Sequence, residues 1–500
     1  MPRLRDNVLA NYAGQAWVAI MGFAFVPLYL RALGSEQFGL VAFMLGLQAI
    51  SLVLDLGVGV FLSRELAQRA HDPARMDSIR RLVRSFEWVV WPTAVFIAAA
   101  IVAASGAIAA HWLNPQQLGA AETTGAVQLM GLAIALSWPT SFYSAALAGL
   151  ERQQRLNVIV AIFATLRFAG VLPVLYYTEA GVHGFLWWYA LVGAAQSLCS
   201  ALVVWRALPP AVQPPRFHFG ELLGARRFAL GVFAVTASAL VLTQVDRLAL
   251  SALRPLPELG YYGVALAVSG GLGRLVQPMF TATYPRLCRF AAGDAQAEIS
   301  ALYHLSSQIV ATVVAAIAAV ICVHPETVLL LWTGDAGLAA QLALPLAVLF
   351  AGAAINGVMS VPYALQLAHG WTALASRSNL VALLVAIPAC IAAIRWQGML
   401  GAASVWLALN IGYLLLVVPL MHRRLLRGEA ARWYRSILPP ALAATAITLL
   451  ARWLWPDVDR SAAGFAWMAA VCVAATVAAV LASANVRTLL LRYLHPRHAY

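Results

Sequence analysis

Residues 80–110, RRLVRSFEWVVWPTAVFIAAAIVAASGAIAA, contain the pattern that decides the fold. Three arginines occupy the first five positions, and the 23 residues from 88 to 110 include no charged side chain. A membrane hydrocarbon core of about 30 Å needs roughly 20 helical residues. The stretch from 86 to 110 therefore predicts a membrane-spanning helix with a basic end outside the lipid.

The composition of the whole chain extends this interpretation. Hydrophobic residues make up 62% of the 500 positions and charged residues 11%, against roughly 45–50% and about 25% in soluble proteins. So few polar side chains cannot cover the surface of a soluble protein of this size. We therefore predict a multi-pass membrane protein, and exclude a soluble enzyme, a nucleic-acid-binding protein and a disordered chain. The net charge of +13 then indicates loops that orient helices and contact anionic lipid.

The apolar segments are too long for the strands of an outer-membrane barrel, and they lack period-2 alternation. We predict an all-α integral membrane protein with about 14 transmembrane helices. The spans are 11–33, 38–63, 86–110, 125–148, 157–178, 184–206, 228–253, 259–285, 303–324, 338–364, 380–396, 398–422, 437–455 and 461–484. The first span is too long for the apolar region of a signal peptide, so it is predicted to be retained.

Arginine placement predicts the orientation. Of the 33 arginines, 25 lie in loops or span ends on one side of the membrane and five in loops or span ends on the other. Because basic loops stay in the cytoplasm, both termini are predicted to be cytoplasmic. The three remaining arginines, Arg167, Arg247 and Arg274, fall within spans.

An internal repeat divides the chain. LRALGSEQFGL at 30–40 is similar to LSALRPLPELGYY at 250–262, and Gly39 matches Gly260 at an offset of 221. Gly149 matches Gly370 at the same offset. We predict a six-helix half at 1–206, a cytoplasmic connector at 207–227, a second half at 228–422, and two additional helices within 437–484. Six is even, so the repeat is parallel, with an axis along the membrane normal.

Several of these stretches resemble a known family. Asn11, Gly14 and Pro27, with the hairpin at 30–40 and LDLG at 54–57, resemble the first two spans of polysaccharide-transport flippases. QVDRLALSAL at 244–253 with ELGYYGVA at 258–265 resembles the seventh span and hairpin, and LLLWTGD at 329–335 the loop after span nine. The resemblance covers about residues 1–420. It points to the Wzx-type O-antigen and exopolysaccharide flippases of the multidrug/oligosaccharidyl-lipid/polysaccharide exporter superfamily.

The resemblance implies a flippase of the bacterial inner membrane that moves undecaprenyl-diphosphate-linked oligosaccharide from the cytoplasmic to the periplasmic leaflet. It also implies a polysaccharide polymerase and a chain-length regulator as partners. The five cysteines are scattered and no GxxxxGK[ST], HExxH or GxSxG motif is present. We therefore expect no metal, no cofactor and no enzymatic activity.

A diphosphate-sugar cargo needs arginine for the phosphate oxygens, and polar groups for the sugars. Ionisable residues within spans are costly, so they normally face the protein interior or water. Seven polar residues within spans are therefore cavity candidates: Asp55, Arg167, Asp246, Arg247, Arg274, Asn11 and Gln15. Each also has a structural alternative, which is an interhelical partner, an interfacial position or a helix–helix hydrogen bond.

The repeat predicts one pairing among the candidates. An offset of 221 from Asp55 gives position 276, two residues from Arg274. These charges would lie at one depth on opposite walls of a cavity and form an inner gate, unless each pairs within its own half.

Two other functions remain open. One is a cation-coupled multidrug exporter of the same superfamily, although three arginines within spans favour an anionic cargo. The other is a membrane-embedded glycan polymerase or ligase, although such enzymes usually need a sizeable outer loop.

Overall fold

The computed structural model describes residues 4–55, 57–70, 76–208, 217–293, 295–456 and 458–494, which are helical almost throughout and contain no strand. The predicted all-α class is confirmed. Ten segments in the described part are long and apolar enough to cross a membrane. They make the chain a multi-pass membrane protein, whereas the number 14 stays a prediction. The helices form two compact units, Met1–Gly263 and Val264–Tyr500.

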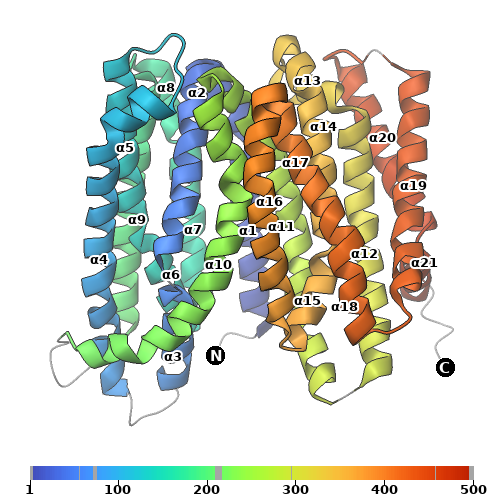
Figure 1. Cartoon of the computed structure of the whole chain (residues 1–500), viewed down its shortest axis with the longest axis horizontal. Coiled ribbons are helices and arrows are strands. Elements are labelled where there is room, and N and C mark those ends of the chain that lie inside the picture. Colours follow the sequence, from blue (N-terminus) through green and yellow to red (C-terminus); the bar gives the residue numbers. More distant parts are fainter. Residues whose placement is uncertain are drawn as a thin grey trace. The chain divides into compact units, whose positions relative to one another are not determined.

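Unit 1 is a bundle of long and broken helices (Figure 1). Its elements are α1 (Leu4–Ala24), α2 (Val26–Ser51), the 3-10 helix η1 (Leu52–Asp55), α3 (Val58–Ala70), α4 (Met76–Ala107), the π-helix η3 (Ile108–Trp112), α5 (Ala120–Ser137), α6 (Pro139–Gly149), α7 (Gln153–Phe168), α8 (Val171–Tyr177), α9 (Gly181–Ala207), α10 (Phe219–Leu253) and the first turns of α11 (Leu256–Ala292).

Glycine and proline set the breaks in these helices. Gly34 has a φ of 73° inside α2, so the chain turns there between the first and second predicted spans. Pro27 and Pro139 lie at the starts of α2 and α6, where a residue without an N–H is tolerated. The breaks leave polar backbone at membrane depth, which is stable only when protein buries it or a cavity solvates it.

The loops at one end of unit 1 are tied together by hydrogen bonds. The buried Glu36 carboxylate accepts hydrogen bonds from the backbone N–H groups of Gln116, Gln117 and Leu118. Next to it, Gln37 Oε1 accepts a hydrogen bond from the N–H of Val182 at 2.9 Å. The hairpin at 34–37 therefore fixes two loops that are distant in sequence.

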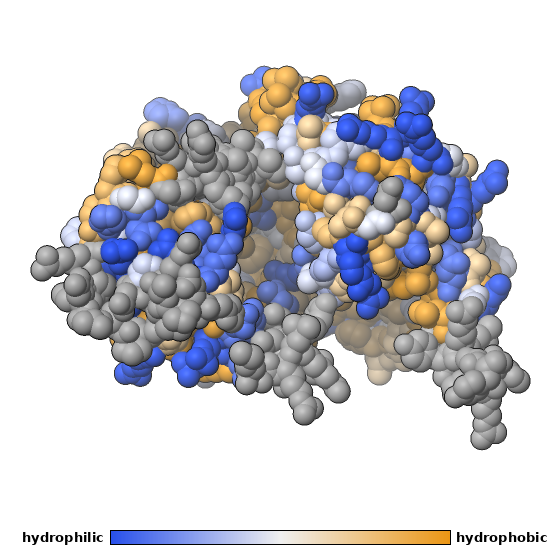
Figure 2. Space-filling view, turned by 90° about the horizontal axis from the view of Figure 1, so that it is seen from below, coloured by the Kyte–Doolittle hydropathy of each residue, from blue (hydrophilic) through white to orange (hydrophobic). Residues whose placement is uncertain are grey.

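The arginine-rich segments lie at the opposite end of unit 1. Arg69 of α3 donates to Glu221 of α10 at 2.8 Å, and Arg81 of α4 lies 3.4 Å from the same carboxylate. The N–H of His218 donates to Ser85 Oγ at 2.9 Å. In Figure 1 this end is the lower one, and Figure 2 shows hydrophilic residues gathered there. Within this unit, the arrangement agrees with the predicted alternation of basic loops.

Unit 2 contains the remainder of α11 and the helices that follow it. These are α12 (Gln296–Val323), α13 (Pro325–Thr333), α14 (Ala336–Val358), α15 (Ser360–Ala368), α16 (Thr372–Gln397), α17 (Met399–Gly412), the π-helix η4 (Tyr413–Val417), α18 (Val418–Leu425), α19 (Ala430–Leu454), α20 (Ala462–Leu481) and α21 (Ala484–Leu494).

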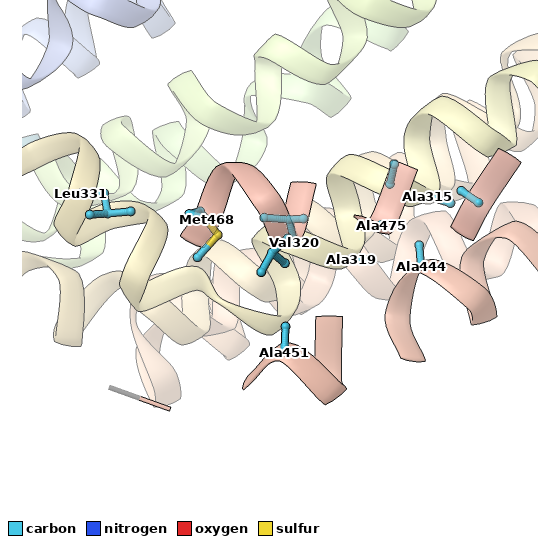
Figure 3. Close-up of a cluster of buried hydrophobic side chains, with 11 residues drawn as sticks. Ala315, Ala319, Val320, Leu331, Ala444, Ala451, Met468 and Ala475 are labelled. Atoms are coloured by element: carbon cyan, nitrogen blue, oxygen red, sulfur yellow. The ribbon is translucent and has the colours of Figure 1, made fainter. Parts of the chain in front are cut away.

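The two helices predicted as an addition to the repeat, α19 and α20, pack on α12. Alanines dominate the contact: Ala315 and Ala319 of α12 share a buried cluster with Ala444 of α19 and Ala475 of α20. Figure 3 shows these small side chains between the three helices. Small residues let helix backbones approach closely in a membrane, where packing replaces the hydrophobic effect.

Three helices lie where the sequence predicts loops. α10 begins at Phe219, inside the predicted connector 207–227, of which residues 209–216 lie outside the described part. α13 occupies most of the predicted outer loop at 325–337, and α21 follows the last predicted span. The division of the chain into 1–206 and 228–422 stays a prediction.

Candidate functional site

A polar cavity of about 200 Å³ lies inside unit 1. Its walls come from α2, η1, α5, α6, α7 and α9. Most of the lining side chains carry hydrogen-bonding groups, which is unusual within a membrane bundle. The lining residues are Gln48, Ser51, Leu52, Ile134, Ser137, Trp138, Thr140, Ser141, Arg167 and Gln196.

The cavity lies where two helices are interrupted. α2 gives way to η1 after Ser51, and α5 ends at Ser137 just before Pro139 begins α6. The indole N–H of Trp138 donates to the Ser51 carbonyl at 3.2 Å and joins the two breaks. Ser137 and Ser141 bond to carbonyls of their own turns. Local backbone geometry therefore explains both the position of the cavity and its polarity.

Arg167 supplies the positive charge of this cavity. It lies in the last turn of α7, and its Nη2 donates to Gln196 Oε1 at 2.8 Å. Its guanidinium carbon lies 4.5 Å from the centre of the Tyr189 ring, a cation–π contact. Tyr189 in turn donates its hydroxyl hydrogen to Gln48 Oε1 at 3.0 Å. Gln196 and Tyr189 thus hold the Arg167 side chain, and Gln48 holds Tyr189 in turn.

The charge of Arg167 has no carboxylate partner in the part of the chain that the structure describes. None of the ion pairs there includes Arg167. Its Nε is buried and has no hydrogen-bond acceptor among the described residues. A guanidinium has five N–H donors in a planar fork. The cavity therefore retains a positive charge that no carboxylate among the described residues neutralises.

Asp55, another predicted cavity residue, has a structural role here. It ends η1, and its Oδ2 accepts a hydrogen bond from the N–H of Gly59 at 3.2 Å, near the start of α3. Gly57, two residues further on, has a φ of 76°. The LDLG motif is thus a helix stop followed by a helix start.

Asp246 and Arg247 lie on α10 and are not among the residues that line this cavity. Asp246 accepts a hydrogen bond from the Tyr262 hydroxyl at 2.6 Å, which joins α10 to α11. Arg247 packs on α2, where a Cβ at Gly46 would lie 2.8 Å from its Cδ. Its Nε is buried without an acceptor among the described residues.

The remaining predicted residues are more exposed. Arg274 is exposed on the α11 segment of unit 2. Gln15 is exposed on α1, and the Asn11 side chain lies outside the described residues. Of the six candidates whose side chains the structure describes, Arg167 is the one that lines the cavity.

Sequence reasoning missed most of the groups around Arg167. Gln48, Gln196 and Tyr189 all lie within predicted spans, but a single amide or tyrosine within a span does not by itself indicate a site. It also missed Glu87, a buried carboxylate that accepts hydrogen bonds from Tyr143 at 2.9 Å and Trp205 at 2.7 Å. Glu87 lies one residue inside a predicted span, where its charge was a sign of a buried polar network.

Solved structures share this fold. The chain is similar to the lipid II flippase MurJ in an inward closed conformation, with a TM-score of 0.70 and 11% identity over 98% of this chain and 99% of that one. It is similar to an inward-facing multidrug resistance MATE family transporter of the MOP superfamily, with a TM-score of 0.64 and 15% identity over 84% and 96%. No curated protein sequence matches the chain.

A third similar structure is a MOP superfamily transporter from Pyrococcus furiosus. Its TM-score is 0.51, with 16% identity over 83% of this chain and 91% of that one, and that protein is described as having a binding pocket of reverse polarity. Together these likenesses define the class, a membrane protein with the MurJ and MATE transporter fold. The family of polysaccharide biosynthesis proteins matches residues 4–291. This match covers more than half of the sequence, and the chain belongs to that family, which confirms the family-level resemblance.

Proposed function

We propose that this protein is a flippase for undecaprenyl-diphosphate-linked oligosaccharide. It moves the repeat unit from the cytoplasmic to the periplasmic leaflet of the bacterial inner membrane for O-antigen or exopolysaccharide synthesis. Membership of the polysaccharide biosynthesis family and the transporter fold support this assignment. Both termini are cytoplasmic in this proposal.

The observation that carries the proposal is the unneutralised Arg167 in a polar cavity. Burying an arginine within a membrane costs about 2.5–3.5 kcal/mol on insertion scales, and a structural ion pair would normally offset part of that cost. The partners of Arg167 are instead an amide and an aromatic ring. A diphosphate oxygen would complete the hydrogen bonding of its fork.

The rest of the cavity suits a sugar. Gln48, Thr140 and Ser141 present amide and hydroxyl groups at its wall, and sugar hydroxyls both donate and accept hydrogen bonds. The polyprenyl tail is apolar and needs no such groups, so it can remain in the lipid while the headgroup crosses.

Arg274 is proposed as a second contact for the diphosphate, because an exposed arginine within a span normally faces water or a charged cargo. Its pairing with Asp55 in an inner gate stays a prediction, and it requires Asp55 to leave the N-terminus of α3. Arg247 and Asp246 contribute less in this proposal, because Asp246 is already bonded to Tyr262.

A multidrug exporter is the main competing function. Two of the solved structures with a similar fold are multidrug resistance MATE family transporters. An uncompensated arginine repels cationic drugs, so the charge of this cavity favours the anionic cargo. The flippase needs no reaction centre, and a polymerase and a chain-length regulator are its expected partners in the pathway.

Reconstitution in liposomes tests the proposal. Purified protein is incorporated with undecaprenyl diphosphate carrying a fluorescent sugar, and a membrane-impermeant quencher reports transfer between leaflets. We expect faster transfer than in protein-free liposomes, and no uptake of a cationic dye. Dye transport without lipid transfer would favour the exporter and contradict the flippase.

A further inference from the structure

One face of α11 in unit 2 is polar although the helix lies in a predicted span. Arg274, Gln277 and Thr281 are exposed on it, and steps of three and four residues place them in one stripe along the helix. A Cβ at Gly270 or Gly273 would meet nothing within 4 Å, so this side of α11 is open. Lipid tails cannot satisfy arginine and amide groups, and the stripe must therefore face water or a polar ligand.

Three aromatic rings lie beside this stripe, Phe280 and Tyr284 on α11 and Tyr363 on α15. Phe280 stacks on Tyr284, one turn later, with ring centres 5.7 Å apart and an angle of 9° between the planes. Phe280 also stacks on Tyr363 of α15, at 6.2 Å and 23°. Tyr363 is 39% exposed. The three rings form a nearly parallel, partly exposed set, which we call the aromatic platform.

We propose that the aromatic platform binds the sugar rings of the lipid-linked oligosaccharide, an inference that rests on the proposed function. The C–H faces of a pyranose are apolar and pack on aromatic rings, while its hydroxyls need polar partners around the rim. Tyrosine offers a flat apolar body with a polar tip. Gln277 and Thr281 supply the remaining donors and acceptors beside the rings.

The spacing along α11 suits a headgroup with its charge at one end. Arg274 precedes Tyr284 by ten residues, about 15 Å of helix. A diphosphate at Arg274 would therefore leave the first sugars along Gln277 and Thr281, toward the platform. An interfacial aromatic belt is the structural alternative, but a belt faces lipid, whereas these rings adjoin the polar stripe.

Binding of two lipids separates sugar recognition from phosphate recognition. Purified protein is titrated with undecaprenyl diphosphate carrying N-acetylglucosamine, and with undecaprenyl diphosphate alone. We expect Tyr363→Ala and Phe280→Leu to weaken binding of the sugar-bearing lipid by about 3- to 10-fold and to leave binding of the sugar-free lipid unchanged. Tyr363→Phe keeps the ring and should bind nearly as wild type does. Tyr177→Ala, which removes a tyrosine 88% exposed in unit 1, is the control.

The outcomes distinguish the two proposals. If the wild type binds neither lipid, the flippase proposal fails and the platform fails with it. If Tyr363→Ala and Phe280→Leu both bind the sugar-bearing lipid as the wild type does, the platform is wrong and the flippase stands. Equal weakening toward both lipids in both variants would likewise overturn sugar recognition by these rings. Equal unfolding temperatures of variants and wild type ensure that folded proteins are compared.

Discussion

Gly39 of α2 and Gly260 of α11 lie against each other in unit 1, too close for either to carry a side chain. A Cβ on Gly39 would collide with the carbonyl oxygen of Leu256, and a Cβ on Gly260 with that of Ser35. Both obstacles are backbone oxygens, which cannot move away by a change of rotamer as a side chain can. The two glycines that the repeat predicts to be equivalent therefore form the closest part of this helix crossing.

Substitution of either glycine should destabilise the protein. Gly39→Ala forces α2 and α11 apart, and overpacking of this kind costs about 1–3 kcal/mol. We expect a lower thermal unfolding temperature in detergent. Gly106→Ala is the control, because nothing lies within 4 Å of that position on α4, and alanine is the better helix former. A Gly39→Ala protein as stable as wild type would contradict the close crossing.

The fold was more predictable than the site. Long apolar segments separated by arginines reveal helices and their order, because the membrane requires both. The number of spans was harder to confirm, since α2 contains the turn at Gly34 and α5 is separated from α6 at Pro139. Hydropathy separates the spans on either side of Gly34, but it does not show the breaks after Ser51 and before Pro139, which border the cavity.

Within the site, Arg167 was predictable because a charge inside a span is costly and rare. Gln48 and Gln196 were not, because a single amide usually bonds to a neighbouring helix and the sequence does not show which helices meet. Asp55 has the same signal as Arg167 but caps α3. The difference is the helix break at Gly57, which gives the Asp55 carboxylate a backbone N–H of α3 to bind.

The ion pair between Arg69 and Glu221 predicts a dependence of stability on pH. Burial raises the pKa of the Glu221 carboxyl, but hydrogen bonds and charge from Arg69 and Arg81 outweigh this and lower its pKa below the usual value. A carboxyl with a depressed pKa stabilises the folded state above its unfolded pKa, near 4.3, and this stability is lost as the pH falls through the folded value.

Glu221→Gln should therefore lose about 1.5–3 kcal/mol of stability at pH 7. The difference from wild type should shrink as the pH is lowered from 6 toward 3. Thermal unfolding across this range measures both effects. Glu179→Gln, at an exposed loop position, should match the wild type throughout. If the difference in stability between Glu221→Gln and wild type did not change with pH, titration of this ion pair could not be the cause of that difference.

Cysteine labelling tests the orientation. All five native cysteines are free in the structure and Cys472 is exposed, so a cysteine-free background is needed. A membrane-impermeant maleimide added outside should label Gln117→Cys in the predicted outer segment 111–124. It should not label Gln68→Cys in 64–85 or Arg427→Cys in 423–436. Labelling of Gln68→Cys from outside would invert the predicted topology.

Arg274 has a test in cells. Arg274→Ala should abolish surface glycan while the amount of protein in the membrane stays constant. Arg274→Lys should restore only part of it, because lysine lacks the bidentate fork. If cells with Arg274→Ala carried normal surface glycan, Arg274 would have no role in transport.

The central claim is that Arg167 holds the anionic headgroup, and the rate of leaflet transfer in liposomes tests it most directly. Loss of charge-assisted hydrogen bonds worth about 1.5–3 kcal/mol predicts that Arg167→Ala transfers the sugar-bearing lipid about 10- to 100-fold more slowly, with Arg167→Lys in between. Arg155→Ala, at an exposed position on the same helix, should transfer at the wild-type rate. Wild-type transfer by Arg167→Ala, at equal protein content, would contradict the role of this cavity.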